Sequence, residues 1–179
     1  MAPRTYTTPQ GMTLEYVEDI GKGNFGTAMA VRRTGRTGRP GQIYCLKKIR
    51  LDAVNFEAEK QVALREVDAM RRAGDHPNVV SFYEHWFHTT TLYVLMEHAA
   101  NKSLDTFLKK YAVEGRHISE TKVHHFCEEL AGALAYCHDT LGVMHRDIKP
   151  ANVLVDDLGS LRLADFGLSR TVEPGALAQ

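Results

Sequence analysis

The sequence predicts an α+β fold in which a sheet formed by the first half of the chain precedes a group of helices. Short runs rich in β-branched and aromatic residues, with one helical segment among them, fill most of residues 14–97. Two segments with apolar residues at helical spacing follow, and a serine precedes each of them, Ser103 and Ser119. Strands that are followed by helices, rather than alternating with them, indicate an α+β architecture.

Composition and charge limit the classes of function. Of the 179 residues 44% are hydrophobic, which is enough for a buried core, and 22 basic residues balance 22 acidic ones. This balance argues against nucleic-acid binding through bulk charge, and no apolar run reaches the length of a membrane span. Three cysteines without CxxC spacing, Cys45, Cys127 and Cys137, favour a reducing compartment. We therefore expect a cytoplasmic protein, with nuclear or cytoskeletal association as alternatives, and neither a membrane nor a nucleic acid as partner.

The N-terminal part of the chain is expected to contain a glycine-rich turn between two strands. Residues 1–13 are rich in Thr and Pro and are expected to form a loose leader. Two strand-like runs then flank Gly21, Gly23 and Gly26, where backbone N–H groups can approach phosphate oxygens without obstruction by side chains. The G-x-G-x-x-G spacing alone is a weak signal, since a structural hairpin or a dinucleotide-binding turn can share it. A dinucleotide-binding turn requires a helix next, whereas residues 28–33 have strand character.

A strand and a helix follow. In the strand of residues 43–49, Cys45 and Lys47 share one face because side chains alternate along a strand. Apolar residues recur every three or four positions within residues 63–70, as in a helix with one buried stripe. Glu66 lies on this helix, nineteen positions after Lys47. An isolated glutamate there could also be the surface partner of a neighbouring Arg or Lys.

Two antiparallel strands, at residues 79–88 and 91–97, are expected to precede helices that begin after Ser103 and Ser119. The second helix has an apolar stripe and should support the polar loop that follows it. The stripe consists of Val123, Phe126, Leu130, Leu134 and Cys137. Histidines and cysteines on the same helix raise the possibility of zinc binding. Their spacing fits no usual ligand pattern, so ordinary helix-face positions are preferred.

The stretch from residue 145 to residue 167 brings chemically active groups together. Two short β-prone runs surround the turn of residues 156–159 and should pair as a hairpin. Asn152 precedes the first run and Asp165 follows the second, so two oxygen ligands meet, as a Mg²⁺ that also binds substrate phosphates requires. Asp147 lies in the preceding loop and can accept a hydroxyl proton, and Lys149 can offset negative charge that develops beside it.

The sequence His-Arg-Asp-Ile-Lys-Pro-Ala-Asn at residues 145–152 and Asp-Phe-Gly at residues 165–167 resemble the catalytic loop and the metal-binding motif of the eukaryotic protein kinases. The resemblance implies a protein-kinase-like fold. A complete five-stranded N-lobe with one main helix would cover residues 14–97, and a hinge with the first part of a helical C-lobe would cover residues 98–179. It also implies ATP and Mg²⁺ as cofactors and a protein serine or threonine as substrate.

The resemblance assigns roles to individual residues. Lys47, held by Glu66, would bind the α- and β-phosphates beneath the three glycines. Asp147 and Lys149 would act on the transferred group. Asn152 and Asp165 would hold Mg²⁺. The residues implied for adenine are Ala28, Cys45, Met96, Glu97, Ala99 and Leu154, with Met96 as gatekeeper and the backbone groups of Glu97 and Ala99 as hydrogen-bond partners. The family usually has valine and alanine at the positions of Ala28 and Cys45. Because one position loses volume and the other gains it, we expect ATP binding to be retained.

The resemblance extends to a subgroup and leaves the function open in one respect. Lys149 indicates serine/threonine specificity, and residues 66–67, 76–80 and 145–149 look most like the NIMA-related (never-in-mitosis) group. Twelve residues follow Gly167, so we expect a fragment that lacks most of the C-lobe and exposes the apolar face of the Ser119 helix. Expressed alone, it should be poorly soluble or depend on a partner. A serine/threonine kinase is the first hypothesis. The alternative is a non-catalytic truncated kinase that binds nucleotide or a partner, and a small-molecule kinase is disfavoured.

Overall fold

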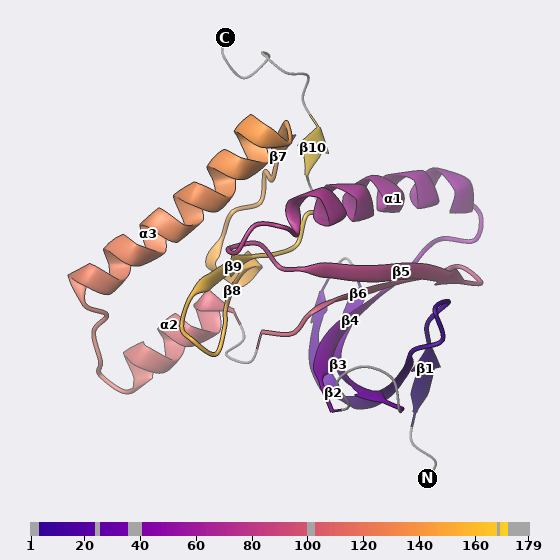
Figure 1. Cartoon of the computed structure of the whole chain (residues 1–179), viewed down its shortest axis with the longest axis horizontal. Helices are drawn as coiled ribbons and strands as arrows, with labels where there is room; N and C mark the ends of the chain where they lie inside the picture. The colour runs from indigo at the N-terminus through magenta and orange to yellow at the C-terminus, as the bar shows by residue number, and fades with distance from the viewer. Residues whose placement is uncertain (1–3, 24–25, 36–40, 100–102, 168, 172–179) are drawn as a thin grey trace. The chain divides into compact units, whose positions relative to one another are not determined.

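The computed structural model describes residues 4–23, 26–35, 41–99, 103–167 and 169–171, and the chain divides into two compact units (Figure 1). The first unit comprises residues 1–67 and 82–98, and the second comprises residues 68–81 and 99–179. Helix α1 (Phe56–Ala73) contributes to both units. Asn24 and Phe25 of the expected glycine-rich turn lie outside the described residues.

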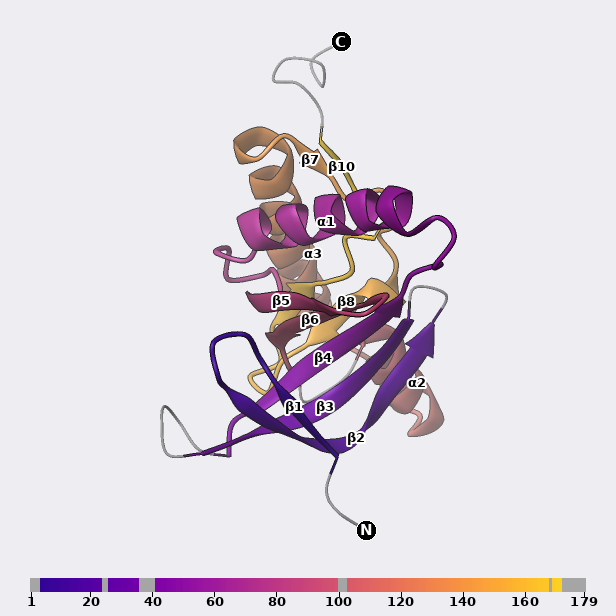
Figure 2. The same cartoon turned by 90° about the vertical axis from the view of Figure 1, so that its right-hand side faces the viewer.

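The first unit is an antiparallel sheet with the strand order β1-β2-β3-β4-β6-β5. Figure 2 shows β2, β3 and β4 side by side. The strands are β1 (Thr5–Thr7), β2 (Thr13–Gly23), β3 (Gly26–Thr34), β4 (Ile43–Arg50), β5 (Phe82–His88) and β6 (Thr91–Glu97). The five expected strands are therefore present, and the α+β fold is confirmed.

The N-terminal segment differs from the loose leader expected for residues 1–13. Residues 5–7 form β1, which pairs with the start of β2, so the described part of the leader adds a sixth strand to the sheet. Thr8 is only 3% exposed, and its backbone N–H donates to the carbonyl oxygen of Met12 at 2.9 Å. The composition did not reveal this, because a Thr- and Pro-rich pattern says nothing of the long-range packing of Tyr6 and Met12 against the sheet core.

One face of the sheet has a core to which β1 contributes. Tyr6, Tyr16 and Trp86 pack against a cluster of buried residues from β2, β3, β4 and β6. The rings of Trp86 and Tyr93 are stacked at 5.3 Å between centroids, and Tyr6 lies 5.9 Å from Tyr93. The cluster consists of Leu14, Met29, Val31, Tyr44, Leu46, Tyr93 and Leu95. Aromatic packing therefore attaches the N-terminal segment to the sheet.

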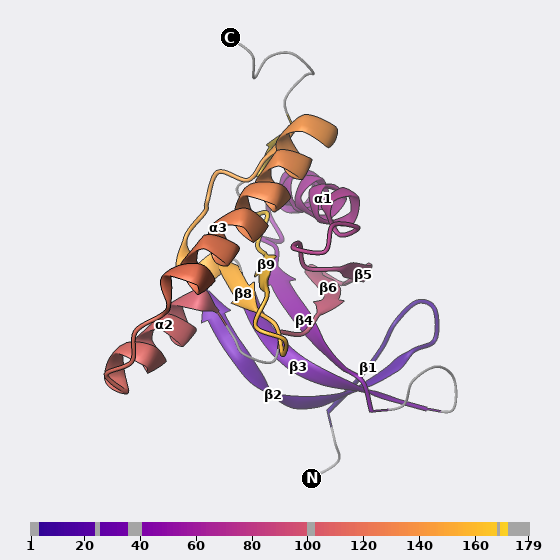
Figure 3. The same ribbon diagram turned by 60° about the vertical axis from the view of Figure 1, so that its left-hand side comes forward.

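The second unit contains the two expected helices, α2 (Leu104–Val113) and α3 (Glu120–Ala135). The predicted caps are confirmed, since Ser103 Oγ accepts from the Thr106 N–H and Ser119 Oγ accepts from the Lys122 N–H, each at 3.3 Å. Figure 3 shows α3 beside strand β9 (Leu161–Leu163). The remaining elements are a π-helical turn η1 (Tyr136–Thr140), a 3₁₀ turn η2 (Pro150–Asn152) and the strands β7 (Val143–Met144), β8 (Val153–Val155), β9 (Leu161–Leu163) and β10 (Arg170–Thr171).

Two expectations about this unit are corrected. Residues 79–81 do not belong to β5, because Val79 forms a parallel bridge with Leu163 beside β9. The apolar stripe that was expected to be exposed is exposed only in part: Phe126 of α3 and Cys137 of η1 are buried, Leu130 and Leu134 are half-buried, and Val123 is 44% exposed. A sequence pattern shows which residues are apolar, but only packing against α2 and β9 decides which of them are covered.

Tyr6 provides a test of whether β1 stabilises the sheet. Replacing Tyr6 by alanine removes its ring from the core, and we expect the free energy of unfolding to fall by about 2–3 kcal/mol. Tyr6→Phe retains the ring and removes a buried hydroxyl group that has no hydrogen-bond partner among the described residues. We expect this variant to match the wild type or to gain up to about 1 kcal/mol.

Urea unfolding followed by the fluorescence of the single tryptophan, Trp86, measures both variants because this residue packs in the same cluster. Equal stability of Tyr6→Ala and the wild type would show that β1 contributes no packing energy.

Candidate active site

A buried histidine joins the loop of residues 145–152 to the segment that follows β9. His145 is 1% exposed, and its Nε2 lies 2.9 Å from the Ala164 carbonyl oxygen. Its Nδ1 accepts from the Asp147 N–H at 3.3 Å, and its ring lies 4.8 Å from that of Phe166. Burial lowers the pKa of His145, although the hydrogen bond to Ala164 opposes this. A neutral imidazole with its proton on Nε2 satisfies both hydrogen bonds.

Asp147, Lys149 and Asn152 are brought together in this loop, as the sequence predicted. The Oδ2 atom of Asp147 accepts from Lys149 Nζ and from Asn152 Nδ2, each at 2.7 Å. The Asn152 amide also donates to the Asp147 carbonyl oxygen at 3.0 Å. The hydrogen bond from Lys149, and then that from Asn152, lowers the pKa of Asp147. The carboxylate is therefore held as an anion in a fixed orientation.

The β8–β9 hairpin places Asn152 and Asp165 at the same end. The Ala164 N–H donates to the Asn152 carbonyl oxygen at 2.9 Å, one step beyond the Val153–Leu163 pair, and Asp165 follows directly. Because the Asn152 amide nitrogen faces Asp147, its side-chain oxygen is the atom that could bind a metal ion. Asp165 has a positive φ of 64°, which is uncommon for a residue other than glycine.

The residues around Asn152 and Asp165 fit a magnesium ion. One amide oxygen and one carboxylate leave coordination positions for water and phosphate, the arrangement that Mg²⁺ prefers. Within the described ranges, no group of three or more His, Cys, Asp or Glu side chains could hold a metal ion. The histidines and cysteines of α3 and η1, which lie in the described ranges, therefore do not form such a group.

Lys47 and Glu66 form an ion pair in the first unit. Their Nζ and Oε1 atoms are 2.9 Å apart, and the side chains are only 13% and 12% exposed. Lys47 lies opposite Ala28 on β3 and Val94 on β6. Glu66 is therefore not the exposed partner of a neighbouring basic residue, the alternative considered from the sequence.

The residues expected to contact adenine come from several elements. In the sheet, Cys45 lies opposite Met96, and Glu97 ends β6. Burial raises the pKa of the Cys45 thiol to about 12 despite the nearby Lys47, so this side chain is an uncharged apolar group. Ala28 lies on β3 with Gly26 at its start, Gly21 and Gly23 lie on β2, and Ala99 and Leu154 belong to the second unit.

The backbone geometry at position 26 requires a glycine. Its φ is +127°, and a Cβ atom there would collide with the carbonyl oxygen of Lys48. The close approach of β3 to β4 therefore excludes any side chain at this position.

Two polar side chains of α3 have partners that the sequence did not predict. Glu129 accepts a hydrogen bond from the Leu161 N–H at 2.9 Å, and Lys122 donates to the Gly159 carbonyl oxygen at 2.7 Å. Their spacing of seven residues places them on one face of α3. This helical spacing was the available signal, but it does not identify partners more than thirty residues away.

The family model and the relatives that match this chain all describe kinases. The family model described as "Protein kinase domain" matches residues 14–179. NUAK family SNF1-like kinase 2 of Rattus norvegicus is 30% identical over 165 residues, which cover 92% of this chain and 24% of that protein. NUAK family SNF1-like kinase 1 of Mus musculus is 33% identical with the same coverage. The chain thus spans about a quarter of the length of these curated relatives. They are not NIMA-related proteins and do not support that subgroup assignment.

No helix in the described parts of the chain could span a membrane.

Replacing Lys149 by alanine removes the main cause of the low pKa of Asp147, so we expect this pKa to rise towards the usual value of about 3.9. Because the folded-state pKa is depressed, the associated stability is present above the unfolded-state pKa and is lost as pH falls through the folded-state value. The variant should therefore show a flatter acid dependence of stability. NMR titration of the aspartate carboxyl carbons measures the shift.

Lys149→Arg is the matched control, since it retains a cationic donor and should keep the Asp147 pKa low. An unchanged Asp147 pKa in Lys149→Ala would contradict the assignment of Lys149 as the main cause.

Proposed function

This chain belongs to the protein kinase family, and on that basis we propose that it forms the ATP-binding and catalytic part of a serine/threonine protein kinase. The reaction transfers the γ-phosphoryl group of ATP to a protein hydroxyl group. The observation that carries the proposal is the set of short hydrogen bonds that join Asp147, Lys149 and Asn152. Asn152 lies at the same end of the β8–β9 hairpin as Asp165. It combines an oriented carboxylate, a cation and metal-binding oxygens in one small region.

The first unit supplies groups for the nucleotide. Lys47, held by Glu66, is proposed to bind the α- and β-phosphates, and backbone N–H groups at Gly21, Gly23 and Gly26 to approach the phosphate oxygens. The buried Lys47–Glu66 pair supports this proposal, because it fixes a cation that would otherwise be mobile. Adenine is proposed to contact Ala28, Cys45, Met96, Glu97, Ala99 and Leu154.

The second unit supplies the groups that act on the transferred phosphoryl. Asp147 orients the substrate hydroxyl group and accepts its proton as the new O–P bond forms and the bond to ADP breaks. Lys149 stabilises negative charge on the transferred group. Asn152 and Asp165 would hold Mg²⁺, which would neutralise phosphate charge when bound.

Two finer assignments rest on the sequence alone. The NIMA-related subgroup was expected from residues 66–67, 76–80 and 145–149 and is not supported by the relatives, and the cytoplasmic location is inferred from the use of cysteine. The second candidate function is a non-catalytic module that binds nucleotide or a protein partner.

Asp147→Asn tests the catalytic role. The variant retains the shape of the side chain and loses the proton acceptor, so we expect phosphotransfer to fall about 10²- to 10⁴-fold while ATP affinity stays within about threefold. Transfer of labelled γ-phosphate to a serine/threonine peptide mixture measures the rate. Asp157→Asn, in the exposed hairpin turn, is the matched control and should retain full activity.

An Asp147→Asn variant as active as the wild type would remove Asp147 from the mechanism. A wild-type chain that binds MgATP without any transfer would favour the non-catalytic module.

Neighbouring lysines on opposite faces of β4 test nucleotide binding. Lys47 pairs with Glu66, whereas Lys48 lies 5.8 Å from the ring of Tyr93. We expect Lys47→Ala to weaken MgATP binding at least about tenfold through loss of a phosphate contact, and Lys48→Ala to change it less than about twofold. Isothermal titration calorimetry measures both. Equal effects of the two substitutions would contradict the assignment of Lys47.

A further inference from the structure

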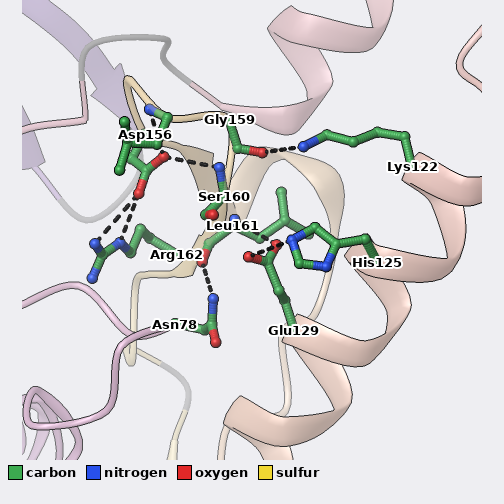
Figure 4. Close-up of polar contacts among 10 residues, drawn as sticks. Asn78, Lys122, His125, Glu129, Asp156, Gly159, Ser160, Leu161 and Arg162 are labelled. Carbon is green, nitrogen blue, oxygen red and sulfur yellow. Dashed lines mark hydrogen bonds and ion pairs between the residues drawn. The ribbon is translucent and has the colours of Figure 1, made fainter.

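Helix α3 contacts the β8–β9 hairpin through charged side chains, as Figure 4 shows. Lys122 reaches the turn, where its Nζ donates to the Gly159 carbonyl oxygen at 2.7 Å. Seven residues later, Glu129 Oε2 accepts from the Leu161 N–H at 2.9 Å, at the first residue of β9. The other carboxylate oxygen of Glu129 lies 3.2 Å from His125 Nε2. A cation and an anion on one helix thus hold successive points of the hairpin.

Burial distinguishes Glu129 from the other acidic residues of α3. Its side chain is 10% exposed, whereas its neighbour Glu128 is exposed and His125 is 51% exposed. A carboxylate this buried requires hydrogen-bond donors to offset its desolvation. The Leu161 N–H is one such donor, and a hydrogen bond from a backbone amide to a carboxylate is stronger than one between neutral groups.

Glu129 completes the hydrogen bonding along the edge of β9 that faces away from β8. On that edge the Leu163 N–H donates to the Asn78 carbonyl oxygen at 2.8 Å, and the Val80 N–H donates to the Leu163 carbonyl oxygen at 3.0 Å. The Asn78 side chain donates to the Leu161 carbonyl oxygen at 3.0 Å. The remaining donor, the Leu161 N–H, donates to the Glu129 carboxylate. The strand is therefore fixed on both edges, by β8 and by residues 78–80 together with Glu129.

The strand fixed in this way leads directly to a proposed metal ligand. Leu163 ends β9, and Ala164 and Asp165 follow. Ala164 also bonds to Asn152, the other proposed ligand. A displacement of Leu161 along the strand axis would move Asp165 relative to Asn152. Loss of a group bonded directly to a metal ligand typically weakens metal binding 10- to 100-fold. Glu129 acts four residues before Asp165, so we expect an effect at the lower end of this range.

We propose that Glu129 is a positioning residue for the metal site: by holding the Leu161 N–H, it sets the placement of Asp165 against Asn152. This inference rests on the proposed function, because it takes these two residues as the Mg²⁺ ligands. Glu129 itself does not touch the metal or the substrate.

Two readouts on the whole chain test the proposal. Hydrogen exchange of the Leu161 amide, followed by NMR, reports the hydrogen bond. The affinity for Mn²⁺ in the presence of ADP, followed by electron paramagnetic resonance, reports the metal site without requiring activity. We expect Glu129→Ala to speed exchange at Leu161 about tenfold or more and to weaken Mn²⁺ binding about tenfold.

Three further variants serve as controls. Glu129→Gln retains an oxygen acceptor and should stay within about threefold of the wild type in both readouts. Glu128→Ala, on the exposed face of the same helix turn, should change neither. Glu129→Asp retains the charge but shortens the reach by one methylene group, so both readouts should change by an intermediate amount. It keeps the test available where Glu129→Ala fails to fold.

Faster exchange at Leu161 with unchanged Mn²⁺ affinity, in Glu129→Ala or Glu129→Asp, would show a purely structural contact and overturn the positioning role. Unchanged exchange would overturn it at its first step. A wild-type chain that binds no Mn²⁺ with ADP would overturn the proposed function together with this inference, so the two failures are distinguished by the behaviour of the wild type.

Discussion

The hydrogen bond between the buried His145 ring and the Ala164 carbonyl oxygen is the contact on which the candidate site depends. It joins two irregular segments, residues 145–149 and 164–167, which repeated secondary structure does not hold in place. Both segments contain a residue with positive φ, Arg146 and Asp165, and such conformations persist only where surrounding contacts enforce them. Because the imidazole is neutral, its burial requires no compensating charge, and each ring nitrogen has one backbone partner.

Local signals in the sequence were sufficient for much of this fold. The helix caps at Ser103 and Ser119 and the hairpin turn at residues 156–159 are specified by nearby residues, and each formed as expected. The grouping of Asp147, Lys149 and Asn152 was also predictable, because all three lie within six residues of one loop.

The features that were missed depend on contacts between distant residues. Strand β1 is held by the ring contact of Tyr6 with Tyr93, eighty-seven residues later, and no local pattern in a Thr- and Pro-rich segment encodes this partner. Glu129 meets Leu161 across thirty-two residues, so its helical periodicity identified a face but not a partner. Residues 79–81 have strand character, but tertiary packing places Val79 and Val80 beside Leu163 of β9, and β5 begins only at Phe82.

The electrostatics of Asp147 bear on how the proposed reaction would proceed. Its Oδ2 atom accepts from both Lys149 and Asn152, and these donors lower its pKa. A carboxylate with a lowered pKa is a weaker base, so we expect it to remove the hydroxyl proton late rather than early in the reaction. Its fixed orientation instead favours alignment of the hydroxyl oxygen, with proton transfer late, as the substrate oxygen loses electron density to phosphorus. This order agrees with a loose transition state, for which positioning and charge stabilisation supply most of the catalysis.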